Sequence, residues 1–300
     1  MLVTGQKTKK VLIIGIDGCR SDALLKANTP TIDSLISIGL FTQSSWHLGK
    51  TKSGPGWSSM LTGVWDAKHR VHNNRFSGHQ FEKYPFFPAY LKALDSTINS
   101  TIIISWKSLA NLAPKFGWDQ SIFAYNDEEC LQKTLQCLST RDPEIIMVHF
   151  NDVDHIGHLS GFELDNPRYI KAIEGLDEKI KRLFYYLNNR PNFTNEDWLI
   201  LSSTDHGGTK HGHSNSSVME RKIWWLGVNS ALPKGQLISQ DPGSFYYPEV
   251  PFCSHAQTPT PYIVDIAATA LDFLMPNSKE LPLTLEGKSW LNKPISNAKN

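Results

Sequence analysis

The chain has 300 residues, of which 40% are hydrophobic and 20% are charged, and its formal net charge is +1. This length is sufficient for one large hydrophobic core. The basic residues are scattered, which argues against a polymeric nucleic-acid partner or a membrane contact. The four cysteines form no CxxC pair, and the N-terminus carries no signal-peptide pattern. We therefore expect a cytoplasmic protein with free thiols.

Strands and helices are predicted to alternate along the chain. Apolar runs predict buried strands at 11–16, 101–106, 145–150 and 198–203. Helical spacing and capping signals predict helices at 28–39, 86–94, 127–139, 167–188 and 264–274. A further helix is expected to begin at about Pro55, after a glycine-rich loop. This alternation predicts an α/β fold with a mainly parallel central sheet and helices on both faces.

Carboxylates and imidazoles follow three of these strands. Asp17 comes directly after the first, Asp154 and His158 follow the third, and Asp205 and His206 follow the fourth. The carboxyl ends of parallel strands are where open α/β sheets place their functional sites. Each motif alone could also be a helix cap or a turn. Their joint occurrence favours a metal site that all three segments share.

Ser53 is the candidate nucleophile for such a site. It lies just ahead of the helix expected at Pro55, and a helix N-terminus favours phosphate and lowers the cost of an alkoxide. A metal ion on the same oxygen would activate the hydroxyl further. The alternative interpretation is that Ser53 only caps the helix.

The order and spacing of seven segments resemble the alkaline phosphatase superfamily, in particular its type I phosphodiesterase and nucleotide pyrophosphatase branch. These segments are IDGCRSD, ANTPTIDSL, KSGPGWSSMLTGVWDAKH, DVDHIGH, TDHGG, GHSNSSVMERKIWWLG and TPTPYIVDIAATAL. The resemblance implies an alkaline phosphatase-like fold with few insertions over residues 9–275. Residues 1–8 would then be a short tail, and residues 276–300 a C-terminal extension that packs on the core or trails from it.

The resemblance also implies two divalent ions and a covalent phosphoenzyme at Ser53. One ion would be held by four residues, namely Asp17, Ser53, Asp205 and His206. The other would be held by Asp154, His158 and one later histidine. Three histidines are candidates for that last ligand. His213, which precedes Glu220 at the family's spacing, matches best, although Ser214 replaces the family's usual glycine; His211 and His255 remain open.

Asn74 resembles the asparagine with which this branch binds a non-bridging phosphate oxygen. The adjacent Asn73 could take its place, and a turn asparagine is the structural alternative. The other histidines, including His47 and His149, belong to no motif, and we interpret them as packing or surface residues.

The predicted function is hydrolysis of phosphodiesters or nucleotide pyrophosphates. Zinc fits the ligand set best, with manganese or magnesium as alternatives. The expected partner is a small phosphorylated substrate, and the protein is expected to be a monomer or a homodimer. A phosphomonoesterase or phosphonate hydrolase of the same superfamily is the second hypothesis. A pseudoenzyme that binds a phosphorylated ligand without turnover is the third, and it predicts a broken ligand set.

Overall fold

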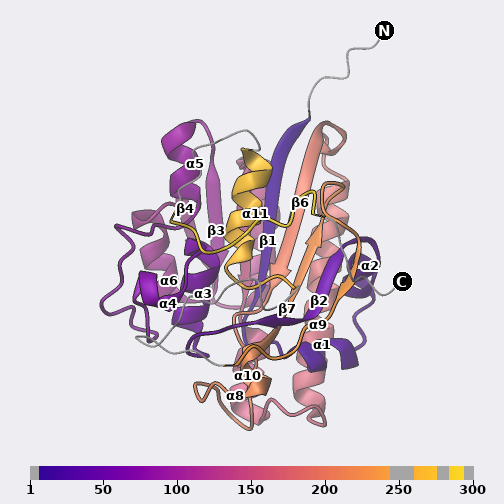
Figure 1. The fold of residues 1–300 in the computed structure, drawn as a ribbon. Coiled ribbons are helices and arrows are strands. Elements are labelled where there is room, and N and C mark those ends of the chain that lie inside the picture. Colours follow the sequence, from indigo (N-terminus) through magenta and orange to yellow (C-terminus); the bar gives the residue numbers. More distant parts are fainter. Residues whose placement is uncertain (1–6, 244–259, 276–283, 294–300) are drawn as a thin grey trace.

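The computed structural model describes residues 7–243, 260–275 and 284–293, and within them a single eight-stranded sheet forms the centre of the molecule (Figure 1). Its strands are β1 (Thr8–Ile16), β2 (Leu40–Trp46), β3 (Ser100–Ile104), β4 (Gln120–Phe123), β5 (Ile145–Phe150), β6 (Glu196–Ser203), β7 (Lys222–Val228) and β8 (Gly235–Leu237). They lie in the order β4-β3-β5-β1-β6-β7-β2-β8.

The centre of the sheet is parallel. β1 pairs in parallel with β5 on one side and with β6 on the other. The register places Gly15 opposite His149 of β5 and opposite Ser203 of β6, so the three strands end at the same level. β7 is antiparallel to both of its neighbours, β6 and β2. The segments that follow β1, β5 and β6 therefore begin side by side at one edge of the sheet.

Helices cover both faces of the sheet. One face carries α1 (Ser21–Lys26), α2 (Pro30–Ile38), α7 (Asp127–Thr140), α8 (Asp152–Ser160) and α9 (Pro167–Asn188). The other carries α3 (Ser53–Thr62), α5 (Pro88–Leu94), α6 (Lys107–Leu112) and α11 (Asp265–Leu274). In Figure 1 α11 lies in front of the sheet and α9 behind it. Alternate residues of β1 enter the two cores, because side chains alternate along a strand: Val11 and Ile13 pack on one side, Leu12 and Ile14 on the other.

The predicted fold class is confirmed, with its helices on both faces of a mainly parallel sheet. The chain-order prediction does not include the strands β2, β4, β7 and β8 or the helices α1, α6 and α8. It also lacks the single-turn helices α4 (Asp66–His69) and α10 (Val218–Arg221). The helix expected at Pro55 begins at Ser53, so the serine is its first residue and Lys52 occupies the cap position. Proline at the third helical position does not interrupt the helix, because the first-turn N–H groups have no partner within the helix.

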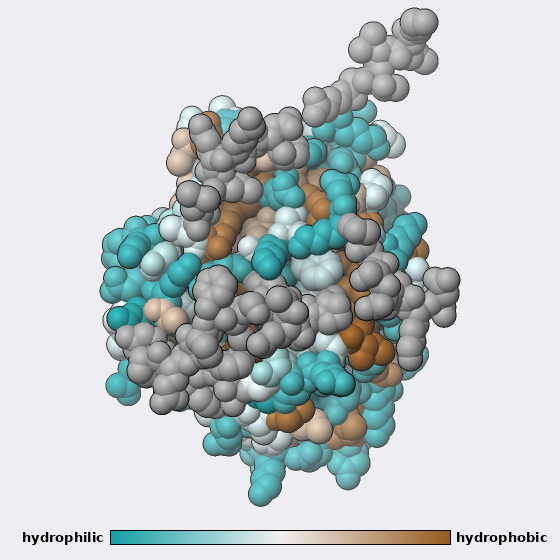
Figure 2. Space-filling view, viewed as in Figure 1, coloured by the Kyte–Doolittle hydropathy of each residue, from teal (hydrophilic) through white to brown (hydrophobic). Residues whose placement is uncertain are grey.

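The described part of the C-terminal segment contacts the core. Glu286 donates its backbone N–H to the carbonyl of Gly63, and Asn292 donates to that of Ala231. Among the described residues, no helix is both long enough and apolar enough to cross a membrane. On the face drawn in Figure 2, the coloured surface is mostly hydrophilic, with hydrophobic residues in smaller patches.

Candidate active site

Two clusters of acids and histidines lie at the edge where β1, β5 and β6 end. The first cluster consists of Asp17, Asp205 and His206, and the second consists of Asp154, His158 and His213. Asp17 directly follows β1, while Asp205 and His206 follow β6 after one intervening threonine. Asp154 and His158 belong to α8, which starts two residues after β5. Within each cluster the candidate ligand atoms lie within 4.8 Å of one another.

The first cluster is buried, and its histidine lies next to the Ser53 hydroxyl. His206 Nε2 lies 3.2 Å from Asp205 Oδ2 and 3.6 Å from Asp17 Oδ1. Ser53 Oγ lies 3.3 Å from the same nitrogen. The hydroxyl, two carboxylates and one imidazole nitrogen therefore converge on one small volume at the start of α3.

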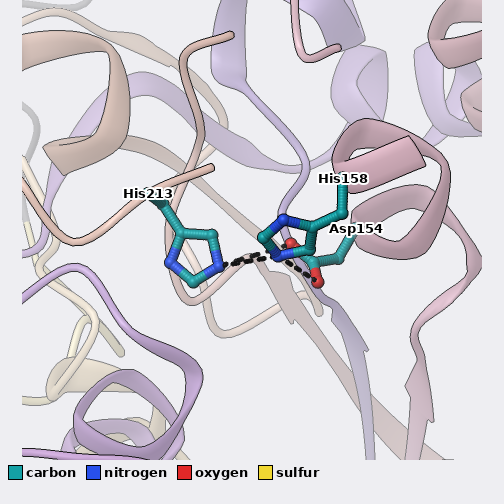
Figure 3. A group of neighbouring side chains, drawn as sticks. All are labelled: Asp154, His158 and His213. Carbon is teal, nitrogen blue, oxygen red and sulfur yellow. Dashed lines mark hydrogen bonds and ion pairs between the residues drawn. The ribbon is translucent and has the colours of Figure 1, made fainter. Parts of the chain in front are cut away.

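The second cluster joins α8 to the loop that follows β6. Figure 3 shows Asp154 and His158 projecting from one helix toward His213, which comes from a loop. His158 Nε2 lies 3.2 Å from His213 Nε2 and 3.4 Å from Asp154 Oδ2. His213 Nε2 lies 3.8 Å from Asp154 Oδ1. The spacing of four residues places Asp154 and His158 on the same side of the helix, one turn apart.

Two glycines allow the two clusters to approach each other. Gly18 has a φ of 63°, and a Cβ at this position would lie 2.5 Å from Asp154 Oδ1. A Cβ at Gly56 would lie 2.7 Å from the Cβ of Asp205. Any larger residue at either position would push an acid of the site away. The turn that follows β1 and the first turn of α3 can therefore pack directly against the carboxylates.

All three histidines of the clusters present Nε2 to the acids. Nδ1 of His158 lies 2.8 Å from the carbonyl of His211, and Nδ1 of His206 lies 2.8 Å from that of Gly207. Nδ1 of His213 lies 2.7 Å from the carbonyl of Thr51. A carbonyl can only accept, so each Nδ1 carries the hydrogen and each Nε2 keeps its lone pair. Histidine ligands of metal ions are commonly oriented by a second hydrogen bond of this kind.

The acids of the clusters leave buried oxygens without hydrogen-bond partners among the described residues. These atoms are Asp17 Oδ1, Asp154 Oδ1 and Asp205 Oδ2. Buried carboxylate oxygens are normally hydrogen-bonded, because an unpaired one costs about 1–3 kcal/mol or more. Each of these three oxygens faces a histidine nitrogen that keeps its lone pair. A divalent cation bound between them would supply the missing partner. We therefore regard the clusters as two candidate metal sites.

The pKa values of these groups support that interpretation. Burial, together with repulsion by Asp17, raises the pKa values of Asp154 and Asp205 well above the usual value. Burial also pushes the pKa of Asp17 upward, but the hydrogen bond from His149 and the nearby imidazoles outweigh it and lower the pKa to about 2. Burial lowers the pKa of His206 to about 4, and that of His213 to about 3. His206 and His213 are therefore neutral near pH 7, as metal ligands must be.

Of the three histidine candidates, the structure brings His213 to the second cluster. His211 is exposed and uses Nδ1 to contact the carbonyl of His158 at 3.3 Å. Its own carbonyl accepts from the imidazole of His158. His211 therefore supports the backbone and the imidazole of His158 but is not among the residues whose ligand atoms form the second cluster. His255 lies outside the described residues.

Asn74 lies next to Ser53. Its amide oxygen accepts a hydrogen bond from the backbone N–H of Gly54 at 2.9 Å, which turns the side chain toward the first turn of α3. Asn73 instead uses its amide oxygen to accept from the backbone of Arg75, within its own turn. The contact with α3 distinguishes Asn74 from its neighbour.

The interpretation of His149 as a residue without a site is wrong. Its Nε2 lies 3.2 Å from Asp17 Oδ2, and the indole N–H of Trp57 donates to the same oxygen at 2.9 Å. These contacts occupy Oδ2 and leave Oδ1 facing His206. His47 is also buried against the site, with Nδ1 2.8 Å from the carbonyl of Asp205. A histidine inside an otherwise apolar strand whose carboxyl end carries a site, as in IIMVHF, was the available signal.

Glu220 anchors the loop that carries His213. One of its carboxylate oxygens accepts from Thr51 Oγ1 at 2.6 Å and from the backbone N–H groups of Ser214, Asn215 and Ser216 at 2.8–2.9 Å. Burial opposes ionisation, but these hydrogen bonds outweigh it and lower the pKa of Glu220. The carbonyl of Thr51 accepts a hydrogen bond from His213. The Glu220 carboxylate therefore positions both the loop that carries His213 and the residue, Thr51, that orients its imidazole.

Comparisons with known proteins identify the family. A profile of the type I phosphodiesterase/nucleotide pyrophosphatase family matches residues 11–94 and 93–223. A bis(5'-adenosyl)-triphosphatase from Bos taurus is 24% identical over 221 residues, which are 67% of this chain and 48% of that protein. Family member 5 of the human ectonucleotide pyrophosphatases/phosphodiesterases is 24% identical over 224 residues, covering 67% and 45%. The chain thus spans about half the length of these relatives.

Solved structures show the same fold. An inactive variant of murine ectonucleotide pyrophosphatase/phosphodiesterase 5, in complex with AMP, superposes with a TM-score of 0.53 and 19% identity over 67% of this chain and 57% of that one. A phosphonate monoester hydrolase from Silicibacter pomeroyi gives a TM-score of 0.63 and 13% identity over 96% and 78%. The expected alkaline phosphatase-like fold is confirmed. On the match of the family profile, the chain belongs to the type I phosphodiesterase/nucleotide pyrophosphatase family.

Proposed function

We propose that the protein is a two-metal phosphoester hydrolase that acts on phosphodiesters or nucleotide pyrophosphates through a phosphoserine at Ser53. One observation carries the proposal. The Ser53 hydroxyl lies at the start of a helix, 3.3 Å from His206 Nε2. The same nitrogen faces carboxylate oxygens that are buried without a hydrogen-bond partner among the described residues. A nucleophile at this place is set for phosphoryl transfer.

The proposed ligand sets follow the two clusters. Asp17, Asp205, His206 and Ser53 would hold one ion, and the second cluster would hold the other. Aspartate oxygens with imidazole nitrogens fit zinc best, and manganese or magnesium would also accept them. When bound, the two ions would favour the alkoxide form of Ser53 and offset negative charge on the phosphoryl group and on the departing oxygen.

The residues of the chain would act in two displacements. In the first, Ser53 Oγ attacks phosphorus, the bond from phosphorus to the leaving oxygen breaks, and that oxygen leaves as an alcohol or a nucleotide after taking up a proton. In the second, water attacks the phosphoserine and releases the phosphorylated product, which restores the hydroxyl. The Asn74 amide, whose oxygen is held by Gly54 N–H, would donate from its nitrogen to a phosphoryl oxygen. The positive end of the α3 dipole favours the same charge.

The choice of substrate class rests on the family. The Bos taurus relative is named a bis(5'-adenosyl)-triphosphatase, and the murine structure holds AMP. We propose a small nucleotide-containing or other phosphodiester substrate for this chain. A second candidate is a phosphonate monoester, because the phosphonate monoester hydrolase superposes over 96% of the chain. The pseudoenzyme hypothesis predicts a broken ligand set, whereas all seven proposed ligands lie in the two sets.

The test compares three chromogenic substrates with purified full-length protein. We expect faster release of p-nitrophenol from bis-p-nitrophenyl phosphate than from p-nitrophenyl phosphate, and loss of both activities after chelation. A faster monoester reaction would favour a phosphomonoesterase, and p-nitrophenyl phenylphosphonate as the best substrate would favour the phosphonate hydrolase. Rates at background with added zinc or manganese would overturn the enzyme hypothesis.

The nucleophile is tested separately. Ser53→Ala should lower the diesterase rate about a thousandfold or more, because the covalent route is removed. The matched control is Ser77→Ala, which removes an exposed hydroxyl from a nearby loop and should leave the rate unchanged. Equal rates for Ser53→Ala and the wild type would show that Ser53 is not the nucleophile.

A further inference from the structure

A hollow of about 400 Å3 lies between α8 and α9, and all of its lining residues belong to these two helices. Its lining consists of Asp152, His155, Ile156, Arg168, Lys171, Ala172, Gly175 and Lys179. Small-molecule pockets in proteins have volumes of about 300–1,000 Å3. The hollow is therefore large enough for a small ligand.

The hollow is separate from the candidate active site. Successive residues of a helix are rotated by about 100°. Asp154 and His158 therefore occupy one side of α8, while the lining residues Asp152, His155 and Ile156 occupy the other. A ligand in the hollow would not contact the two clusters, although it would share a helix with the second one.

Positive charge gathers around the hollow. The side-chain nitrogens of Arg168, Lys171 and Lys179 make no hydrogen bond or ion pair with any described residue. Elsewhere on α9 the cations are paired: Lys181 with Glu178, and Arg182 with Glu128. Among the lining residues, one carboxylate, that of Asp152, faces three cations. The lining is therefore positive. Arg168 and Lys171 are the cations most available to an anion, because the charge of Lys179 also acts on Asp127 and Glu128 of α7.

Helix α9 is weakened at this place. Gly175 lies in the interior of a 22-residue helix, where glycine costs about 1 kcal/mol relative to alanine. A Cβ added to Gly175 would meet no atom within 4 Å, so no packing constraint requires glycine. Arg168 and Lys171, three residues apart, also place like charges on one side of the helix, which is destabilising. The lack of a side chain at Gly175 leaves the hollow open, and Arg168 and Lys171 make its lining positive.

We propose that this hollow binds a small phosphorylated molecule that carries hydroxyl groups, such as a nucleotide or a sugar phosphate. The cations provide charge-assisted hydrogen bonds to the phosphate. The Asp152 carboxylate accepts a hydrogen bond from a hydroxyl group. Ile156 and Ala172 provide an apolar surface for the remainder of the ligand.

The experiment counts AMP molecules bound per chain of the zinc-loaded, full-length protein by equilibrium dialysis. We expect two in the wild type, one in the hollow and one at the Ser53 site. Gly175→Leu fills the hollow and should bind one fewer. The matched control, Gly175→Ala, should bind as many as the wild type. Both substitutions replace glycine with a better helix former, so the melting temperature should stay the same or rise.

The charge requirement is tested with Arg168→Ala combined with Lys171→Ala, which should also lose one AMP, and with neutral adenosine, which should not occupy the hollow. If the proposed active site fails to bind AMP, the wild type binds one molecule and Gly175→Leu binds none, which still supports the hollow. Equal AMP counts for the wild type and Gly175→Leu would overturn the proposal. Undiminished binding of adenosine would overturn its phosphate specificity.

Discussion

The first and second clusters lie at the same edge of the sheet but are held in different ways. In the first, every side chain is buried and follows a central strand closely, and His149 holds Asp17 from the neighbouring strand. In the second, the side chain of His158 is 44% exposed, and His213 lies on a loop that depends on Glu220. The sheet itself supports the first cluster, whereas contacts between a helix and a loop support the second.

This difference has a consequence for metal binding. A ligand set that is already in place before the ion arrives loses little conformational entropy on binding, and a loop that must be ordered loses more. We therefore expect the ion of the first cluster to bind more tightly than the ion of the second. The following substitutions test this expectation.

The largest effect is expected for Asp205→Ala. It removes the buried carboxylate whose Oδ2 lies 3.2 Å from His206 Nε2. We expect diesterase activity to fall to background and zinc content to fall from about two ions per chain to about one, since one ligand set is broken. Elemental analysis of dialysed protein measures the ratio. Unchanged zinc content would contradict the ligand role of Asp205.

The second effect separates two neighbouring histidines. His213→Ala should remove the weaker ion and lower kcat/KM by about 100-fold or more, because the imidazole belongs to the ligand set. His211→Ala is the matched control and should keep both ions, since this residue supports His158 through its backbone carbonyl. Loss of the second ion in His211→Ala, with its retention in His213→Ala, would reverse the assignment.

A smaller and selective effect is expected from the residues that support the ligands. Glu220→Gln replaces the carboxylate that accepts from the His213 loop, and His149→Ala removes the donor to Asp17. Such substitutions typically lower metal affinity about 10–100-fold. Competition titrations with a zinc chelator should show that Glu220→Gln weakens one ion and His149→Ala the other. Equal weakening of both ions by either variant would mean that the clusters do not have separate supports.

The smallest effect concerns Asp127, which holds the start of α8. Its carboxylate accepts from the backbone N–H groups of Asn151 and Asp152. Burial, together with repulsion by Asp152, raises the pKa of Asp127 to about 7. A carboxyl whose pKa is raised in the folded state stabilises the fold at low pH, and this contribution is lost as the pH rises from about 4 to about 7.

Asp127→Asn removes this dependence, because an amide does not titrate. The variant should gain stability relative to the wild type by at most about 1.4 kcal/mol per pH unit across that range. Urea unfolding between pH 4 and pH 8 measures the difference. A constant difference at all pH values would mean that Asp127 does not titrate in this range.

The sequence was informative wherever a local pattern carried the structure. The apolar runs predicted β1, β5 and β6, and the periodicity predicted α9 with its observed bounds. Residues adjacent to a strand end must lie near that end, so the positions of Asp17 and Asp205 followed directly from the prediction of the strands. Short edge strands such as β4 carry too few residues for a pattern, and their pairing depends on neighbours far along the chain.

The sequence by itself therefore determined the fold class, the strand ends and six of the residues at the candidate site, because each depends on neighbours within a few positions. The tertiary structure decided that His213 rather than His211 joins Asp154, because this choice depends on the carbonyl of Thr51 and the carboxylate of Glu220. It also decided that His149 supports Asp17, which requires the register of two strands that are far apart in the chain. Contacts between distant segments leave no local pattern, and only packing reveals them.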